Sequence, residues 1–341
     1  MITLLVAIRL ACPQSDAALP APDLQSLDPV RATVKRAVNW IARQAIASTE
    51  HDDTVVFPEA AGKGVQGAQI YGGTAGVLLF LENAAAVLDD ARARALADAA
   101  TNGLLAARSK TASGALTWIT RAMPEGATSL YLGDAGIGQA FLTRARLRGD
   151  EDALATAVEV ADSIIARGKK SDDQLSWDRQ VDIIFGAAGT VLFLLDLGEE
   201  TKEPRFVEAA RAAAHWLIQQ AVAEPGEDAG RRLLSWRTQM AFGMPYVNFS
   251  HGTAGVAYAL ARVAGAAHDQ DCARAAHAGA AWVLEQTIAE GDGMVADART
   301  HQAHHGRLVP RPPEPHGCSC CCTSRPRSSA TSTSRSRRRA G

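Results

Sequence analysis

The sequence predicts an all-α fold, an α/α toroid (barrel) of repeated helix hairpins, and three observations lead to this prediction. A turn of the form Gly-x-x-Gly recurs four times along the chain. A nearly continuous apolar run follows each turn, and an amphipathic stretch follows each run. Alanine, the strongest helix former, is abundant in both kinds of stretch. At 341 residues, 47% of them hydrophobic, the chain can bury a substantial core.

Each turn is expected to open an inner helix. A helix that is apolar on nearly every face must be buried. The turns contain two glycines three positions apart, which suits a helix start packed so closely that a Cβ would clash. These structural glycines are Gly73 and Gly76, Gly133 and Gly136, Gly186 and Gly189, and Gly252 and Gly255.

The amphipathic stretches are expected to form an outer layer of half-exposed helices. They cover residues 90–107, 150–167, 205–221 and 271–288, and in the third of them the apolar positions fall on one stripe. A ring of inner helices wrapped by outer helices satisfies both patterns. It also places every inner-helix N-terminus, with its unsatisfied N–H groups and positive dipole end, at one mouth, where a site is expected.

A Leu-x-Trp segment precedes three of the turns at a spacing of 59 residues. Its tryptophans are Trp118, Trp177 and Trp236. Because they recur with the period of the scaffold, we expect them to pack between repeats rather than to line a site.

Two of the turns resemble those of a known family. One is the run from Asn248 to Tyr258, in which His251 precedes Gly252. The other is the run from Val181 to Gly189, in which Asp182 stands four residues before Gly186. Both resemble the His-Gly-x-x-Gly repeat of the lanthionine synthetase C-like proteins (LanC-like proteins, the lantibiotic cyclases and their relatives). The resemblance covers residues 30 to 300 or so and includes all four turns.

The resemblance implies a fold and a chemistry. The fold is an α/α toroid of about seven helix pairs, related to the six-hairpin glycosidases. The activity adds a Cys thiol of a precursor peptide to a dehydrated Ser or Thr, which forms a thioether ring. A zinc ion, held by two Cys and one His from later repeats, lowers the pKa of the thiol. The partners implied are such a peptide and a dehydratase.

The same resemblance assigns candidate catalytic residues. His251 matches the turn histidine, a candidate general acid, and Asp182 matches an acidic partner. Each has a structural alternative: His251 could cap its inner helix, and Asp182 could accept N–H groups from its own turn. For Asp134, inside the second turn, we favour the role of an acid at a helix N-terminus.

Two other functions stay open beside the zinc-dependent cyclase. One is a metal-free toroid that binds a peptide or thiol without catalysis. The other is a carbohydrate-active toroid, for which Asp134 and Asp182 give only a weak pair of carboxylates, in a chain with 5% aromatic residues. The chain outside its tail has more acidic than basic residues, which argues against nucleic acid. A monomer is favoured.

The sequence divides into a leader at residues 1–28, the LanC-like toroid at 29–306 and a basic tail at 307–341 that is rich in Cys, Ser and Arg and reads as disordered. The family's zinc motifs are not present in frame after Gly255, so the toroid is read as incomplete and no metal ligand is assigned. The His and Cys residues near the tail match no established zinc spacing. They are His304, His305, His316, Cys318, Cys320, Cys321 and Cys322.

The leader favours a cytoplasmic protein. The apolar run from Ile2 to Ala11 is short, is broken by Arg9 and lacks a basic start. Export, or lipid anchoring through Cys12, is the weaker alternative. No apolar stretch approaches the ~20 residues that a membrane span needs.

The tail leads to a first prediction, that it is an out-of-frame translation of a further repeat. Leu308-Val309-Pro310-Arg311 can be encoded by bases that give Trp-Cys-His and the start of a Gly codon when read one base later. Sequencing the coding DNA is expected to find a small insertion or deletion near codon 308 that restores a turn and an apolar helix. If no such change restores them, the hypothesis is wrong.

Overall fold

A computed structural model describes residues 27–47, 53–57, 67–118, 126–226, 232–238, 245–290 and 293–296. The leader before residue 27, with Cys12, lies outside these residues. So do residues 297–341, with the tail cysteines and His304, His305 and His316. The predictions made for those segments stay predictions.

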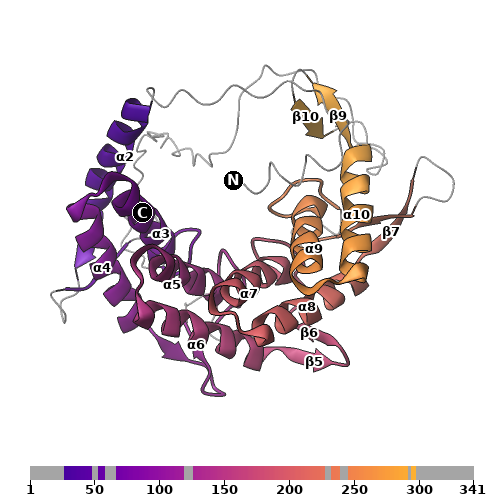
Figure 1. The fold of residues 1–341 in the computed structure, drawn as a ribbon, viewed down its shortest axis with the longest axis horizontal. Helices are drawn as coiled ribbons and strands as arrows, with labels where there is room; N and C mark the ends of the chain where they lie inside the picture. Colours follow the sequence, from indigo (N-terminus) through magenta and orange to yellow (C-terminus); the bar gives the residue numbers. More distant parts are fainter. Residues whose placement is uncertain are drawn as a thin grey trace, which may run out of the picture. The chain divides into compact units, whose positions relative to one another are not determined.

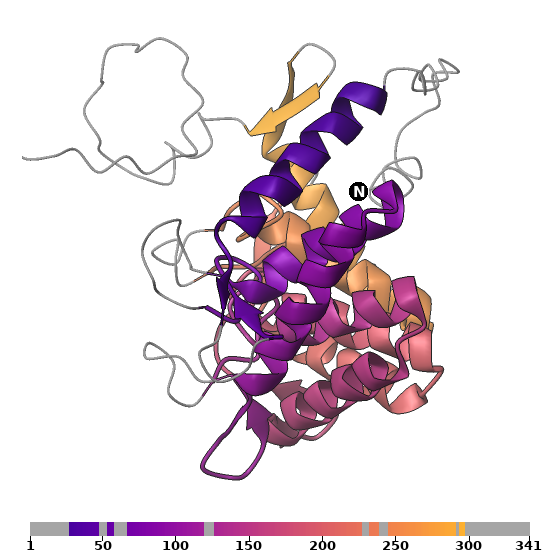
Figure 2. The same ribbon diagram turned by 90° about the vertical axis from the view of Figure 1, so that its left-hand side faces the viewer.

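Within the described residues, α2 (Leu27–Ala42) precedes four helix hairpins. These are α3 (Thr74–Leu88) with α4 (Ala91–Ala106), α5 (Asp134–Arg148) with α6 (Glu151–Arg167), α7 (Ala187–Thr201) with α8 (Pro204–Gln219), and α9 (Thr253–Ala267) with α10 (Gln270–Glu285). Each inner helix contacts the next, so α3, α5, α7 and α9 form an inner arc that α4, α6, α8 and α10 cover from outside (Figure 1). The helix α2 packs against α3 and α4 (Figure 2). The predicted all-α fold of α/α toroid type is confirmed.

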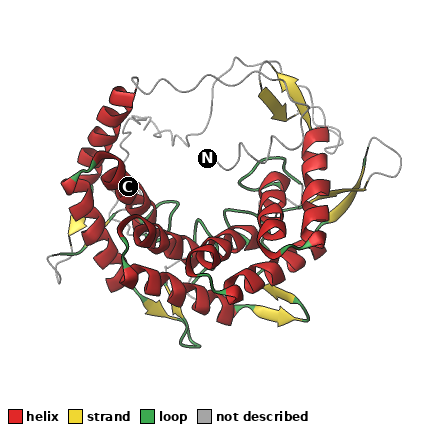
Figure 3. Ribbon diagram, viewed as in Figure 1, coloured by secondary structure: helices red, strands yellow, loops and turns green. Residues whose placement is uncertain are grey.

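The structure also contains short antiparallel strand pairs, which the sequence did not predict. They are β1 (Ile46–Ala47) with β2 (Val55–Val56), β3 (Ser109–Lys110) with β4 (Leu116–Thr117), β5 (Lys169–Ser171) with β6 (Gln174–Ser176), β7 (Val222–Pro225) with β8 (Arg232–Ser235), and β9 (Thr287–Glu290) with β10 (Gly293–Ala296). Each pair follows α2 or an outer helix, and the pairs between hairpins lead the chain back to the next turn (Figure 3). Strands of two to four residues are too short to produce a period-two pattern.

The two helix layers differ in burial as their sequences predict. On the inner helix α7, the side chains of Val191, Phe193 and Leu194 are fully buried. On the outer helix α8, Phe206 and Leu217 are fully buried, while the opposite face is exposed. Burying one such side chain stabilises the fold by about 1.5–3 kcal/mol. None of the helices in the part of the chain that is described is long and apolar enough to cross a membrane.

The recurring tryptophans belong to the scaffold, in line with their prediction. Each stands directly after the second strand of a pair and donates its indole N–H to a carbonyl near the end of the preceding outer helix. The bonds run from Trp118 to Leu104 at 2.8 Å, from Trp177 to Ile164 at 2.7 Å and from Trp236 to Leu217 at 2.7 Å. The strand pairs are thereby fixed to the ends of the outer helices.

The second glycine of each turn is needed for space. A Cβ built on Gly76, Gly136, Gly189 or Gly255 would lie 1.9–2.1 Å from the carbonyl oxygen six residues earlier. A Cβ on Gly189 would also lie 2.7 Å from the Cβ of Leu130, in the loop of the preceding repeat. The inner helices therefore start in direct contact with the loops that lead into them, which confirms the expected close packing.

This packing predicts opposite effects for two glycine substitutions. In Gly189→Ala the new methyl group would meet the Ile183 carbonyl at 2.1 Å, so the free energy of unfolding should fall by about 1–3 kcal/mol. Gly265 lies near the exposed end of α9 with nothing within 4 Å of its Cβ position, so Gly265→Ala should add about 0.5–1 kcal/mol. Urea unfolding followed by circular dichroism measures both. Equal effects from the two substitutions would contradict the packing argument.

Candidate functional site

The loops before the inner helices are joined to one another by backbone hydrogen bonds. The N–H of Tyr71 donates to the carbonyl of Tyr131 at 3.0 Å, and the N–H of Tyr131 donates to that of Ile184 at 3.3 Å. The N–H of Ile183 donates to the carbonyl of Ser250 at 3.2 Å. The four turns therefore form one continuous surface at the N-terminal ends of the inner helices, which we call the mouth.

The mouth does not offer the first N–H group of each inner helix to a ligand, contrary to what the sequence suggested. Each of these groups donates to a loop carbonyl seven residues earlier. The bonds run from Thr74 to Gly67 (2.9 Å), Asp134 to Ala127 (2.8 Å), Ala187 to Gln180 (3.0 Å) and Thr253 to Tyr246 (2.7 Å). The expectation was wrong at these positions because the loop folds back over the helix start and caps it with backbone oxygen.

The two candidate catalytic residues lie side by side at the mouth. The Nδ1 atom of His251, just before the fourth turn, is 3.0 Å from the Oδ2 atom of Asp182, in the loop before the third turn. The carboxylate is fully buried, whereas 31% of the histidine side chain is exposed. Residues 69 positions apart in sequence are thus paired by the contact of neighbouring turns.

Asp182 also accepts N–H groups from its own turn, which is the structural alternative considered for it, and one of its carboxylate oxygens has this role. Its Oδ1 atom accepts the backbone N–H of Phe185 at 2.7 Å. Its carbonyl accepts the N–H groups of Gly186 at 3.2 Å and Gly189 at 3.3 Å. The carboxylate is therefore held rigidly while its second oxygen faces His251.

His251 does not cap its helix. The N-cap residue of α9 is Gly252, and no side chain caps it. The ring of His251 stacks on Phe185, with 5.2 Å between centroids and 20° between planes, and its backbone N–H donates to Asn248 Oδ1 at 2.8 Å. Since a carboxylate accepts, we assign the proton of the neutral ring to Nδ1. The Nε2 atom then carries the lone pair, on a partly exposed ring.

The aromatic side chains at the mouth were not predicted from the sequence. The side chain of Tyr71 is 71% exposed and meets that of Tyr131 edge to face at 6.5 Å between centroids. Phe249 is 39% exposed and packs on Tyr258. Tyr71, Tyr131 and Phe249 each stand two or three residues before the first glycine of a turn, and this position could have identified them. The aromatic content of the whole chain, 5%, gives no indication that these residues gather at the mouth.

Asp134 is part of the scaffold, as favoured, although its role goes beyond that of an acid near a helix dipole. It is buried, and its carboxylate accepts the Thr117 hydroxyl at 2.8 Å and the Trp118 N–H at 3.1 Å. It also forms an ion pair with Arg167. Its oxygens are thus engaged by β4, Trp118 and α6, so it does not act as a second free carboxylate beside Asp182.

The described residues do not fit the zinc site that the resemblance implies. The site that the resemblance implies takes two cysteines and one histidine from the later repeats. The one cysteine in the described part of the chain is Cys272, and it lies at the start of the outer helix α10. Because α10 returns from the end of α9, this position is at the opposite end of the hairpin from Gly252.

The hairpins, the Gly-x-x-Gly turns and the paired His251 and Asp182 define a repeat protein of the α/α toroid class. The sequence model of the lanthionine synthetase C-like proteins matches residues 64–307, and the chain belongs to this family. No curated protein sequence matches the chain.

Two solved structures of limited similarity are glycoside hydrolases. One is a family 76 mannosidase from Bacteroides thetaiotaomicron, with a TM-score of 0.49, 12% identity, and coverage of 76% of this chain and 73% of that one. The other is a family 76 glycoside hydrolase from a bovine Bacteroides thetaiotaomicron strain, with a TM-score of 0.45 and 13% identity. The match covers 76% of this chain and 57% of that one.

The geometry predicts that Asp182 controls the tautomer of His251. In Asp182→Asn, the amide oxygen can keep the Phe185 N–H bond while the amide nitrogen donates to His251 Nδ1, so the ring proton should move to Nε2. Nitrogen-15 NMR of the histidine ring measures the two tautomers. Asp134→Asn, which disturbs a buried carboxylate elsewhere in the turns, should leave the His251 signals in place. Unchanged signals in Asp182→Asn would contradict the pairing.

Proposed function

We propose that the chain adds a peptide Cys thiol to a dehydrated Ser or Thr, forming a thioether, and that His251 moves the proton of this reaction at the mouth. The observation that carries the proposal is the pairing of His251 Nδ1 with the buried carboxylate of Asp182 at 3.0 Å. Membership of the lanthionine synthetase C-like family supports the choice of reaction.

The reaction needs one proton to leave and one to arrive. The thiol sulfur forms a bond to the β-carbon of the dehydrated residue, and the electrons of the carbon–carbon double bond move to the α-carbon and its carbonyl as an enolate. His251 Nε2 takes the thiol proton as a general base and returns it to the α-carbon as a general acid, so no proton is gained or lost overall. Such a group contributes typically 10²–10⁴-fold to a rate.

Asp182 has a supporting role in this mechanism. Its Oδ2 atom holds the ring in the tautomer with Nδ1 protonated, and it stabilises the imidazolium that exists between the two proton transfers. Its Oδ1 bond to Phe185 and the stacking of Phe185 on His251 keep the ring in one orientation. This rigidity favours a proton transfer that starts and ends on the same nitrogen.

The exposed aromatic side chains of the mouth are the proposed contact surface for the peptide. Tyr71, Tyr131 and Phe249 are rigid, partly exposed groups, and Phe249 is two residues from His251. Aromatic groups of this kind bury large areas on binding at low entropic cost. The dehydrated residue must itself come from a reaction that removes water from Ser or Thr.

A second candidate is a toroid that binds a thiol peptide at the same mouth without catalysis. It is favoured by the absence of a cysteine ligand at the mouth among the described residues. The two candidates differ in whether bound peptide loses its thiol. The carbohydrate alternative is weaker still, because Asp134 is engaged by Thr117, Trp118 and Arg167.

The test uses a peptide with one cysteine and one dehydroalanine. Thioether formation does not change its mass, so unreacted thiol is counted by alkylation and mass spectrometry. His251→Gln should slow thiol loss by about 10²–10⁴-fold and Asp182→Asn by at least ~10-fold, with unchanged peptide affinity. His277→Gln, on the exposed face of α10, is the control that should react normally.

Two outcomes would overturn the proposal. Peptide binding by the wild-type chain without any loss of thiol would favour the non-catalytic toroid. Equal rates in wild type and His251→Gln would remove His251 from the chemistry. Fluorescence anisotropy of a labelled peptide provides the affinity in each case.

A further inference from the structure

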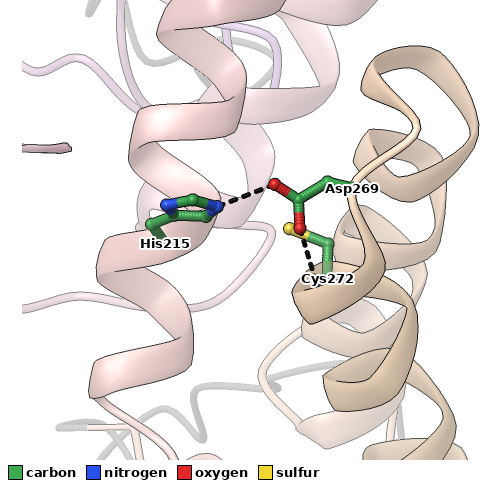
Figure 4. A group of neighbouring side chains, drawn as sticks. All are labelled: His215, Asp269 and Cys272. Atoms are coloured by element: carbon green, nitrogen blue, oxygen red, sulfur yellow. Dashed lines mark hydrogen bonds and ion pairs between the residues drawn. The ribbon is translucent and has the colours of Figure 1, made fainter.

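A second cluster of reactive side chains, which we call the outer cluster, lies in the outer layer of helices. It is at the end of the α9–α10 hairpin that is opposite the mouth. His215 comes from α8, whereas Asp269 is the N-cap residue of α10 and Cys272 lies in the first turn of that helix. One possible ligand atom from each residue lies within 4.8 Å of the other two. The three side chains converge from the two helices (Figure 4), with His215 Nε2 at 2.8 Å from Asp269 Oδ2.

We propose that His215, Asp269 and Cys272 bind a single transition-metal cation of the zinc type. An imidazole nitrogen, a carboxylate oxygen and a thiolate form a donor set that suits zinc and its neighbours and does not suit magnesium or calcium, which prefer oxygen alone. Bonds of about 2.0–2.3 Å in a tetrahedron separate the ligand atoms by roughly 3.3–3.5 Å. The ligand atoms lie within 4.8 Å of one another, so binding an ion would need shifts of at most about 1.5 Å in their separations.

The groups behind the cluster hold the ligands in the orientation that a metal needs. Asp173 Oδ2 lies 2.5 Å from His215 Nδ1, so a carboxylate fixes the ring from behind and leaves Nε2 to face the cluster. The other oxygen of Asp269, Oδ1, accepts the backbone N–H of Cys272 at 2.9 Å. The helix cap thereby keeps Oδ2 pointed toward His215.

An ion can reach the cluster from the surface. A cavity of about 660 Å³ reaches the cluster at His215, and Asp173 and Asp271 also line it, whereas Asp269 and Cys272 lie behind its wall. The side chain of His215 is 14% exposed and that of Asp269 is 9% exposed, while Cys272 is fully buried. The ion would enter on the His215 side and keep a water molecule as its fourth ligand.

The competing occupant of the cluster is the proton. Partial burial opposes the charged imidazole, but the hydrogen bonds to Asp269 and Asp173 outweigh it and raise the pKa of His215. Burial raises the pKa of the Cys272 thiol to about 12, with a contribution from Asp269. Arg211 Nη1, at 3.7 Å from Asp269 Oδ2, also competes for the carboxylate. Without metal the cluster is an ion pair between α8 and α10; with metal it is a cross-link between the same helices.

The test uses the full chain with Cys12, Cys318, Cys320, Cys321 and Cys322 replaced by Ser, which leaves Cys272 as the one thiol. Cadmium is titrated and the thiolate-to-metal charge-transfer absorption is recorded. We expect one cadmium per chain and a raised melting temperature. Cys272→Ala should abolish the band.

Matched variants distinguish the loss of a metal ligand from a loss of folding. Asp269→Asn keeps an N-cap of equal quality and should weaken cadmium affinity at least ~10-fold, as should His215→Gln. Asp173→Asn should weaken it by about 10–100-fold. His277→Gln, also on α10, should leave it unchanged. Circular dichroism checks that each variant is folded.

The proposal fails if the wild-type cluster shows no charge-transfer band. It fails equally if the band and the affinity survive unchanged in both His215→Gln and Asp269→Asn, because the cysteine would then bind metal by itself. Either result would leave the cluster as a proton-bridged ion pair.

Discussion

The contact between the first turn of each inner helix and the loop that leads into it is the constraint on which the rest depends. The second glycine of the turn lies against the carbonyl six residues earlier, and the first N–H group of the helix donates to the carbonyl seven residues earlier. This contact fixes the path of the loop. The fixed loops then bond to one another through Tyr71, Tyr131 and Ile183, so the mouth exists only because the helix starts are so tightly packed.

The first backbone N–H groups of the inner and outer helices have different kinds of hydrogen-bond acceptor. The outer helices α4, α6 and α10 have aspartate caps, at Asp90, Asp150 and Asp269, whose carboxylates accept backbone N–H groups of the first turn. The inner helices have glycine at the N-cap and backbone carbonyls as acceptors. Because the loop backbone caps α9, the side chain of His251 is available for other contacts.

The sequence could predict the features that repeat. Four turns with the same glycines, each before an apolar run, are sufficient to locate the inner helices, and the tryptophan period is sufficient to place Trp118 and its equivalents in the scaffold. The family resemblance, and not the repeat pattern itself, marks His251 and Asp182 as partners, because the two residues stand at different distances before their turns. The strand pairs could not be predicted, since two to four residues contain no usable period.

The outer cluster shows the limit of reading a single sequence. His215 and Asp269 are 54 positions apart and belong to different hairpins, and Asp173 reaches the same histidine from a strand connection 42 positions earlier. None of the three stands at a position that the turns mark. Their meeting depends on how far α10 is shifted along α8, and that shift is set by packing of the whole outer layer, which no local pattern encodes.

The buried carboxylate of Asp182 joins the fold and the proposed chemistry in one side chain. One oxygen holds its own turn through Phe185, and the other faces the histidine of the next turn. Removing the whole side chain would therefore disturb the turn and the ring together, whereas an amide of the same shape separates the two roles. The bond between Ile183 and Ser250, next to both residues, sets the distance between the turns. The pair consequently depends on the contact between two successive repeats, and neither hairpin could form it alone.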